Sequence, residues 1–301
     1  MNIYDCFTYF NEDVLLEIRM ETLDRHVNYF VIAESTHTQS GLPKPLNFRL
    51  ERFRQFQSKI IYVVVNDMPL HLNNAWANEN HQRRSLMRGL VGARPEDLVI
   101  VSDLDEIPNP LKISLYKSNY LRATFIQRLF YYKFNNEAFN PITHEPVLWR
   151  GSQMTNYRHL VNFFGDTQNL RIYNPTGPLR SIKRLWLKRF RNMDIDVGGW
   201  HFSWVMSDDR ILEKIKSMAH QEYNTPDIAS LKAINSALLR GEDILRRDIF
   251  FRKLDIDDGF PEYIIANRLR FDEYMIKESN TSYADQKIPF EFKAHSKRDQ
   301  L

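Results

Sequence analysis

Apolar and polar positions alternate along the first hundred residues in a way that predicts strands separated by helices. Four short, nearly continuous apolar runs predict buried strands, at residues 3–10, 27–35, 59–65 and 98–103. Between these runs, Asn11 is placed to cap one helix, and a second helix is expected over 76–90. This β-α-β order predicts an open, mostly parallel sheet with helices on both of its faces.

The pattern changes in the middle of the chain. Residues 123–134 predict one long strand, and 170–205 hold short strand-like pieces separated by Gly and Pro. Helical spacing returns after Ser207, and a further helix is predicted from Thr225 to Gly241, with a proline in its first turn. We therefore expect a smaller antiparallel part joined to the parallel sheet, followed by C-terminal helices.

The polar residues after the fourth strand are the first candidates for chemistry, since ligands of open α/β sheets bind at the carboxyl ends of the strands. Residues 98–109 read LVIVSDLDEIPN, with carboxylates at Asp103 and Asp105. Two carboxylates at i and i+2 on a strand point to the same face, so both can approach one cation. Such oxygen ligands suit Mg²⁺ or Mn²⁺ shared with a nucleotide diphosphate. The alternative is a solvated acidic turn before Pro108.

Three further residues carry candidate chemistry, each with a structural alternative. His201, in the aromatic run GGWHFSW, is either a metal ligand or phosphate donor, or a histidine satisfied within the core. Arg83 on the expected 76–90 helix can pair with a diphosphate or lie exposed. Glu222, in HQEYN at a helix end, is a candidate general base or a surface residue.

Composition narrows the function classes. The 301-residue chain carries a formal net charge of +3, which is too small to indicate nucleic acid binding. Its single cysteine, Cys6, forbids an intramolecular disulfide. With no signal-like start and no apolar run of membrane-spanning length, we expect a cytoplasmic protein. Covalent hydrolase chemistry has no support, because no Walker loop, CxxC, HExxH or GxSxG motif occurs.

One local cluster of charge stands out against this modest total. Residues 180–191 read RSIKRLWLKRFR, with six basic side chains. Such a run is either a solvated face or a site that meets phosphates or an anionic membrane surface. We keep both interpretations open, the second as a peripheral membrane contact.

Six stretches spread over roughly residues 3–275 occur in a recognisable order. They are LLEIRMETL (15–23), residues 29–46, Trp76 with Arg83, LVIVSDLDEIP (98–108), GWHFSW (199–204) and HQEYN (220–224). In this order they resemble glycosyltransferase family 17. The resemblance implies an α/β fold of the GT-A type, with a Rossmann-like sheet, a UDP-sugar donor and inversion at the anomeric carbon. It also implies a metal site at Asp103 and Asp105, with Glu34, Arg83 and His201 in the donor pocket.

The same resemblance divides the chain. It implies a single GT-A domain over 1–275, with a nucleotide-sugar half over about 1–108 and an acceptor half over about 109–275. Residues 276–301 are expected to be a C-terminal tail.

The expected reaction is metal-dependent transfer of a sugar, GlcNAc from UDP-GlcNAc, onto a glycan or lipid-linked glycan. Mn²⁺ or Mg²⁺ would be held by Asp103, Asp105 and His201, and Asp103 would also contact the donor. Glu222 is the first candidate for the base that deprotonates the acceptor hydroxyl, and Glu106 is the second. Two rival classes stay open: a sugar nucleotidyltransferase and a non-catalytic carbohydrate-binding protein.

Overall fold

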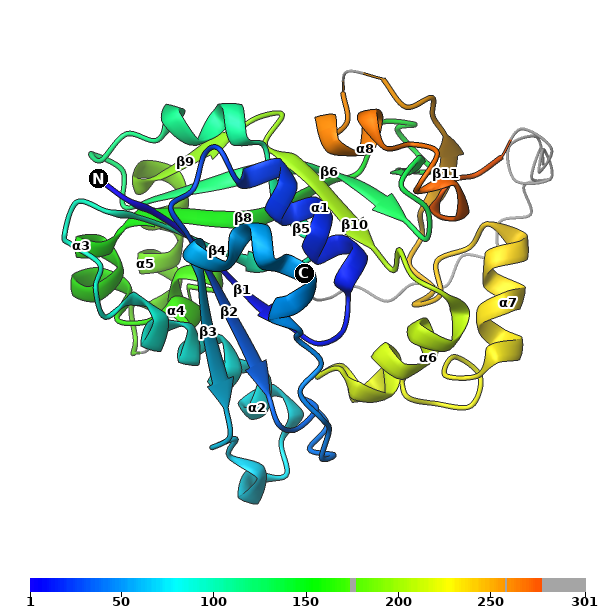
Figure 1. Ribbon diagram of the computed structural model, residues 1–301, viewed down its shortest axis with the longest axis horizontal. Coiled ribbons are helices and arrows are strands. Elements are labelled where there is room, and N and C mark those ends of the chain that lie inside the picture. The colour runs from blue at the N-terminus through cyan, green and yellow to red at the C-terminus, as the bar shows by residue number, and fades with distance from the viewer. Residues whose placement is uncertain (174–176, 258, 278–301) are drawn as a thin grey trace.

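The fold is built around one mixed sheet, seen in a computed structural model that describes residues 1–173, 177–257 and 259–277 (Figure 1). The sheet has 11 strands, and its main path runs β11-β7-β6-β8-β4-β1-β2-β3. The predicted α/β architecture, a parallel sheet joined to an antiparallel part, is confirmed. Most of the predicted tail, residues 278–301, lies outside the described residues.

The parallel half of the sheet is formed by the four strands predicted from apolar runs. They are β1 (Ile3–Tyr9), β2 (Tyr29–Ser35), β3 (Ile60–Val65) and β4 (Leu98–Asp103). β1 pairs in parallel with both β2 and β4, and β2 pairs in parallel with β3. Alternate residues of β2 enter different cores: Phe30 and Ile32 lie in one, and Val31 and Ala33 lie in the other. Burial on both faces explains the nearly continuous apolar runs.

Helices cover both faces of this half. One face carries α1 (Asp13–Leu23), a 3₁₀ segment (Leu50–Lys59) and α8 (Glu262–Ala266). The other face carries α2 (Ala75–Ser85) and its 3₁₀ continuation (Leu86–Leu90). The expected cap at Asn11 is wrong. The helix α1 begins at Asp13, so Glu12 is the N-cap residue, and its side chain makes no capping hydrogen bond.

The antiparallel part begins at β4 and extends to the edge of the sheet. Its strands are β5 (Glu106–Pro108), β6 (Arg122–Tyr131), β7 (Asn136–Phe139), β8 (Leu148–Asn156), β9 (Asn192–Ile195), β10 (Gly199–Ser203) and β11 (Phe250–Lys253). β8 lies between β4 and β6 and is antiparallel to both. The long strand predicted over 123–134 is β6, which also pairs in parallel with β9 and β10.

Shorter helices complete the second half. They are α3 (Tyr157–His159), α4 (Thr167–Arg171), α5 (Arg180–Trp186), α6 (Asp208–Ser217) and α7 (Leu231–Arg240), with π-helical turns at Leu160–Phe164 and Leu187–Arg191 and 3₁₀ turns at Leu70–Leu72, Pro110–Leu115, Gln221–Tyr223 and Asp272–Tyr274. The expected start of α7 at Thr225 is wrong, since the Ser230 side chain caps the helix through the Ala233 amide. Its end at Gly241, where φ is 63°, is confirmed. None of the described helices has the length and apolar character needed to cross a membrane.

Candidate active site

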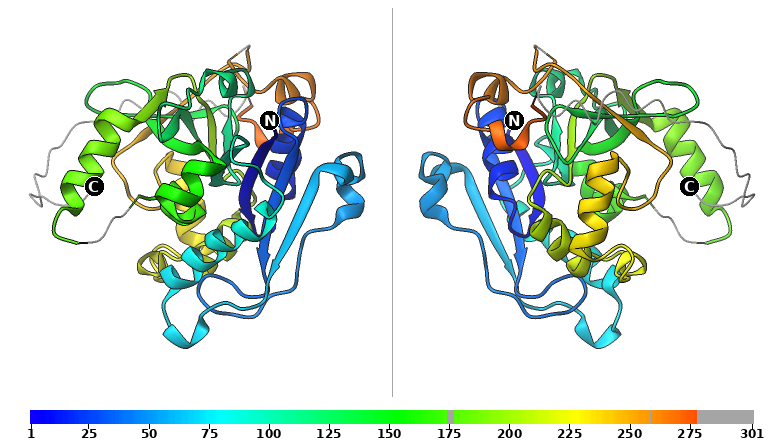
Figure 2. Two further views of the ribbon diagram at one scale, coloured as in Figure 1. Left: turned by 90° about the vertical axis from the view of Figure 1, so that its left-hand side faces the viewer. Right: turned by 90° about the vertical axis from the view of Figure 1, so that its right-hand side faces the viewer.

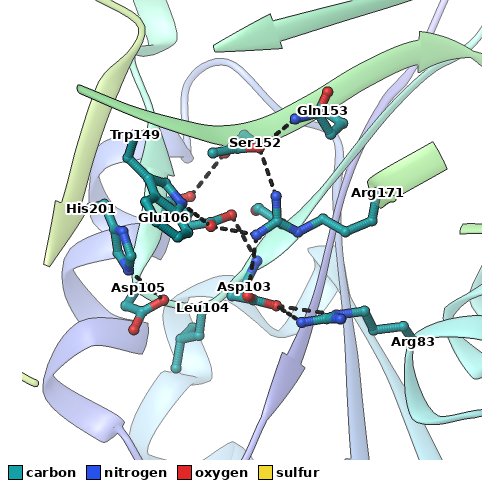
Figure 3. Close-up of polar contacts among 12 residues, drawn as sticks. Arg83, Asp103, Leu104, Asp105, Glu106, Trp149, Ser152, Gln153, Arg171 and His201 are labelled. Carbon is teal, nitrogen blue, oxygen red and sulfur yellow. Dashed lines mark hydrogen bonds and ion pairs between the residues drawn. The ribbon is translucent and has the colours of Figure 1, made fainter. Parts of the chain in front are cut away.

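The candidate site lies at the carboxyl end of β4. Asp103 is the last residue of that strand, and Asp105 lies in the turn that leads into β5. Because the strand ends at Asp103, the alternation that places residues i and i+2 on one face does not extend to Asp105. Figure 3 shows Asp103 facing Arg83 and Arg171, whereas Asp105 faces His201. The sequence pattern predicted that the two carboxylates share one face. This prediction is wrong, because they face different partners.

A buried arginine, Arg19, holds this turn in place through hydrogen bonds. Arg19 of α1 is fully buried and forms a bidentate ion pair with Asp5 of β1, at 2.6 and 2.7 Å. Its guanidinium also donates to Ser102 Oγ at 2.6 Å and to three backbone carbonyls within 103–106, at 2.9 to 3.2 Å. One side chain thus provides a hydrogen-bond donor to three backbone carbonyls in and beside the turn.

Asp103 is held between two arginines. Arg83 Nη2 of α2 lies 2.8 Å from one carboxylate oxygen, and Arg171 Nη2 of α4 lies 3.2 Å from the other. Burial alone would raise the pKa of Asp103, but the two guanidinium charges hold it below its ordinary value. Arg83 is buried rather than exposed, and it also pairs with Glu79 at 3.0 Å. The cluster is therefore rich in guanidinium donors suited to phosphate oxygens.

Glu106 is the second carboxylate that Arg171 reaches. It is fully buried, and it accepts from Arg171 and, at 2.6 Å, from Trp149 Nε1 of β8. The Asp103 amide donates to its other oxygen at 3.2 Å. Burial raises the pKa of Glu106 and exceeds the opposing effect of the Arg171 charge. Glu106, the second candidate base, is therefore part of the Asp103 cluster.

Asp105 and His201 form a second group beside the first. His201 Nε2 lies 3.6 Å from Asp105 Oδ1, and Lys214 Nζ of α6 lies 3.3 Å from Oδ2. Burial would raise the pKa of Asp105, but the Lys214 and His201 charges lower it. His201 reaches this position because Gly199 adopts φ +128°, and a Cβ there would lie 2.1 Å from the Ile107 carbonyl oxygen. The backbone thus approaches the Ile107 carbonyl too closely at this position for any residue but glycine.

The side chains of Asp105 and His201 are suitable ligands for a divalent cation that is also coordinated by a diphosphate. The 3.6 Å between His201 Nε2 and Asp105 Oδ1 is too long for a hydrogen bond, and each atom is an acceptable ligand for Mn²⁺. Within residues 1–173, 177–257 and 259–277, no three His, Cys, Asp or Glu side chains converge as a complete protein cage. Substrate phosphates commonly complete such shells. Asp103 forms its ion pairs with Arg83 and Arg171, and its role as a third metal ligand stays a prediction.

Glu34 has a different environment from the one expected for a donor ligand. Its buried carboxylate accepts from Lys44 Nζ and from the Asn47 amide, both at 2.6 Å. Its other oxygen accepts from the Phe48 amide at 3.0 Å and from Tyr62 Oη at 2.9 Å. Glu34 thereby anchors the loop after β2, and no contact joins it to the Asp103 cluster in the residues described. Its role in donor binding stays a prediction.

Glu222 also lies outside the Asp103 cluster. It is exposed and accepts a hydrogen bond from His220 Nδ1, which lowers its pKa against the opposing effect of burial. The His220 ring packs edge-on against Trp76, with 4.4 Å between ring centroids. Trp76 is on α2 about two helical turns before Arg83, so Glu222 lies near the helix that supplies one of the Asp103 arginines. Its role as base stays a prediction.

Sequence reasoning missed Arg19, Arg171, Trp149 and Lys214 as site residues. Arg171 and Trp149 lie 65 and 43 residues from the Glu106 carboxylate that they both contact. No local motif marks either residue, because α4 is a single short turn and β8 is an ordinary strand. A weak signal existed for Arg19, which is a charged residue within the buried face of α1.

The sequence of this chain matches a known protein family. The model of glycosyltransferase family 17 matches residues 1–162, more than half of the chain. The chain belongs to glycosyltransferase family 17. The matched segment of this family 17 chain contains Arg19, Arg83 and the turn 103–106, whereas Arg171 and His201 lie beyond it.

Curated relatives match about two thirds of the chain. The β-1,4-mannosyl-glycoprotein 4-β-N-acetylglucosaminyltransferases of Mus musculus and Homo sapiens are each 26% identical over 225 residues. These matches cover 69% of the family 17 chain but 41% and 42% of the relatives. The chain thus spans less than half the length of those proteins.

Solved structures give a weaker likeness. A putative glucose-1-phosphate thymidylyltransferase from Bacillus anthracis is 11% identical, with a TM-score of 0.35 over 66% of this chain and 88% of that one. The inositol-1-phosphate CTP transferase from T. maritima is 10% identical, with a TM-score of 0.35 over 65% and 85%.

Proposed function

We propose that this chain transfers GlcNAc from UDP-GlcNAc to a glycan acceptor, with inversion at the anomeric carbon. The observation that carries the proposal is the pair of buried guanidinium groups, Arg83 and Arg171, on either side of Asp103 at the carboxyl end of β4. That edge of an open α/β sheet is where nucleotides bind. The choice of GlcNAc rests on the names of the curated relatives, and the choice of UDP rests on the family resemblance.

Each group of side chains at the site has its own role in the proposed transfer. Charge develops on the diphosphate as the sugar leaves, so Arg83 and Arg171 would orient and neutralise it there. A divalent cation held by Asp105 and His201 would add positive charge at the same diphosphate. A carboxylate must also take the proton of the acceptor hydroxyl. Glu222 and Glu106 both stay candidates, and Glu106 would have to act while bound by Arg171.

Loss of Arg83 is expected to weaken the donor complex. An Arg83→Ala variant should bind UDP-GlcNAc about 1.5–3 kcal/mol less tightly, the scale of a lost charge-assisted hydrogen bond. Titration calorimetry with UDP-GlcNAc, UDP, a GDP-sugar and a CMP-sugar measures this loss and tests the choice of donor. Arg84→Ala is the matched control, because Arg84 is the next residue of α2 and pairs with Asp166 at the surface.

Three results would contradict the proposal. Tighter binding of the GDP- or CMP-sugar would overturn the donor. Tight UDP-GlcNAc binding without release of UDP in the presence of Mn²⁺ would favour a carbohydrate-binding protein. Release of pyrophosphate from UTP and a sugar phosphate would favour a nucleotidyltransferase.

The basic segment 180–191 is the proposed peripheral membrane contact. It contains α5 at an outer edge of the molecule (Figure 2) and no acidic residue. Leu179, just before the segment, and four of its large apolar side chains are exposed, whereas Leu187 is buried. The exposed ones, Leu179, Ile182, Leu185, Trp186 and Phe190, are 41 to 64% accessible. Residues 179, 182, 186 and 190 follow helical spacing, so they form one stripe between basic side chains. This combination is typical of helices that lie in an anionic lipid interface.

Vesicle binding is therefore expected to depend on charge and on this stripe. The protein should sediment with vesicles containing phosphatidylglycerol and not with pure phosphatidylcholine, and high salt should release it. An Ile182→Gln/Phe190→Gln variant should partition at least about 100-fold less, since each buried apolar side chain contributes roughly 1.5–3 kcal/mol. Leu111→Gln/Leu269→Gln removes two equally exposed apolar residues elsewhere and should bind normally. Equal binding by both variants would remove the segment from this role.

A further inference from the structure

A cavity of about 480 Å³ opens beside the proposed active site, between the β6–β8 surface and α5. Five cationic side chains line it: Arg122, Arg150, Arg171, Arg184 and Lys188. Its volume is in the range of small-molecule sites. Neutral polar groups, among them Thr124 and Gln153, complete the lining.

Positive charge in this cavity exceeds the negative charge that the chain provides. Arg150 is matched by Asp194, through two bonds of 2.7 Å, and Arg171 is matched by Asp103 and Glu106. In the described part of the chain, neither Arg184 nor Lys188 has a carboxylate within 4 Å. Two full positive charges at the rim of the cavity are therefore uncompensated.

Arg122 is the residue least expected from packing alone. It is half-buried, and among the described residues its guanidinium bonds only neutral oxygens, Asn192 Oδ1 at 2.8 Å and the Leu170 carbonyl at 3.1 Å. Burial, with the charges of Arg150 and Arg171, lowers the pKa of Arg122 to about 10. A guanidinium placed among other cations without an acid partner is unfavourable unless an anion joins it.

Arg171 belongs both to the cavity lining and to the proposed active site. The same side chain lines the cavity and bonds Glu106 and Asp103. Its Nε–H is buried and has no acceptor among the residues that the structure describes. An anion in the cavity would therefore lie one side chain away from the proposed transfer site.

We infer that this cavity binds a phosphate group of the acceptor, with Arg122, Arg184 and Lys188 as its principal donors. The inference rests on the proposed function, because it assigns the cavity to the acceptor of that transfer. Phosphate fits better than a carboxylate, since it offers more acceptor oxygens and up to two charges to cations that come from β6 and from the α5 segment. A phosphosugar and the phosphate of a lipid-linked glycan both present this group.

The test is titration of inorganic phosphate into protein saturated with UDP, at constant ionic strength. Saturable binding is expected in the wild type, weakened about tenfold or more in Arg122→Gln, on the scale of one charge-assisted hydrogen bond. The Arg184→Gln/Lys188→Gln double variant changes only exposed residues and should show a similar loss. It keeps the test decisive if Arg122→Gln fails to fold. Arg189→Gln, on the same segment but outside the cavity lining, should bind phosphate normally.

Phosphate binding that is equal in all four proteins overturns the inference, and so does acetate binding as tightly as phosphate. Displacement of phosphate by glucose 1-phosphate would identify a soluble phosphosugar as the source. Displacement only by vesicles containing phosphatidic acid would identify a lipid headgroup. If UDP binds but phosphate does not, the inference fails and the proposed function stands. If UDP does not bind, the titration is run without it, and binding that depends on Arg122 leaves the cavity assigned while the proposed function fails.

Discussion

Replacing Arg19 by methionine is expected to lower the free energy of unfolding by about 3–5 kcal/mol, the cost of removing one partner of a buried ion pair. Arg19 and Asp5 are both fully buried, so the change leaves an unpaired carboxylate in the core. It also removes the Arg19 donor from the Asp103 and Leu104 carbonyls, and leaves the Glu106 carbonyl with Ser152 Oγ at 3.0 Å. Urea unfolding followed by circular dichroism measures the loss.

A double variant separates the charge from the turn. Asp5→Leu/Arg19→Met removes both charges, and most of the lost stability should return, since apolar replacement of a buried pair is often neutral. Activity should remain low in the double variant, because the Asp103 and Leu104 carbonyls, which flank the turn that positions both Asp103 and Asp105, still lack the Arg19 donor. Arg25→Met, just past the end of α1 and exposed, should change stability by no more than about 0.5 kcal/mol. A cost for Arg19→Met as small as that of Arg25→Met would show that the network is dispensable.

The parallel half of the fold could be predicted from sequence because its strands are buried on both faces. In β2, Val31 and Ile32 enter opposite cores, so no polar position interrupts the run. Helix starts were less predictable, since several polar residues near each start can cap. Ser230 caps α7 although the Thr225-Pro226 pair had the stronger sequence pattern.

The site was predictable where it follows a strand and not where it depends on tertiary contacts. The strand end located Asp103, and His201 was expected to share a metal site with Asp105, from which it lies 3.6 Å. The sequence could not reveal that Asp103 would be paired by Arg171, which lies 68 residues away in a short helix. The i, i+2 rule also gave the wrong orientation for Asp105, because it holds only while the strand continues.

Metal dependence is the prediction with the largest expected effect on activity. EDTA should abolish UDP release from UDP-GlcNAc, and Mn²⁺ should restore it. Asp105→Ala should lower turnover about 100-fold or more, roughly 2.7 kcal/mol of barrier, because it removes a ligand of the cation that would neutralise the leaving diphosphate. Asp227→Ala, which breaks an exposed ion pair with Arg246, is the control. Full turnover in EDTA would exclude the metal and leave the Arg83, Arg171 and Lys214 charges to stabilise the diphosphate.

A variant of His201 tests whether Asp105 and His201 form a metal site or whether His201 only packs in the core. His201→Ala should lower turnover about tenfold or more, roughly 1.4 kcal/mol of barrier, and change the melting temperature little. Manganese binding in the presence of UDP, followed by electron paramagnetic resonance, should weaken in parallel, because the 3.6 Å contact with Asp105 places the imidazole among the proposed ligands. His159→Ala removes a partly buried histidine from α3, away from the site, and should leave both quantities unchanged. A clear drop in melting temperature with normal manganese binding would instead make His201 a packing residue.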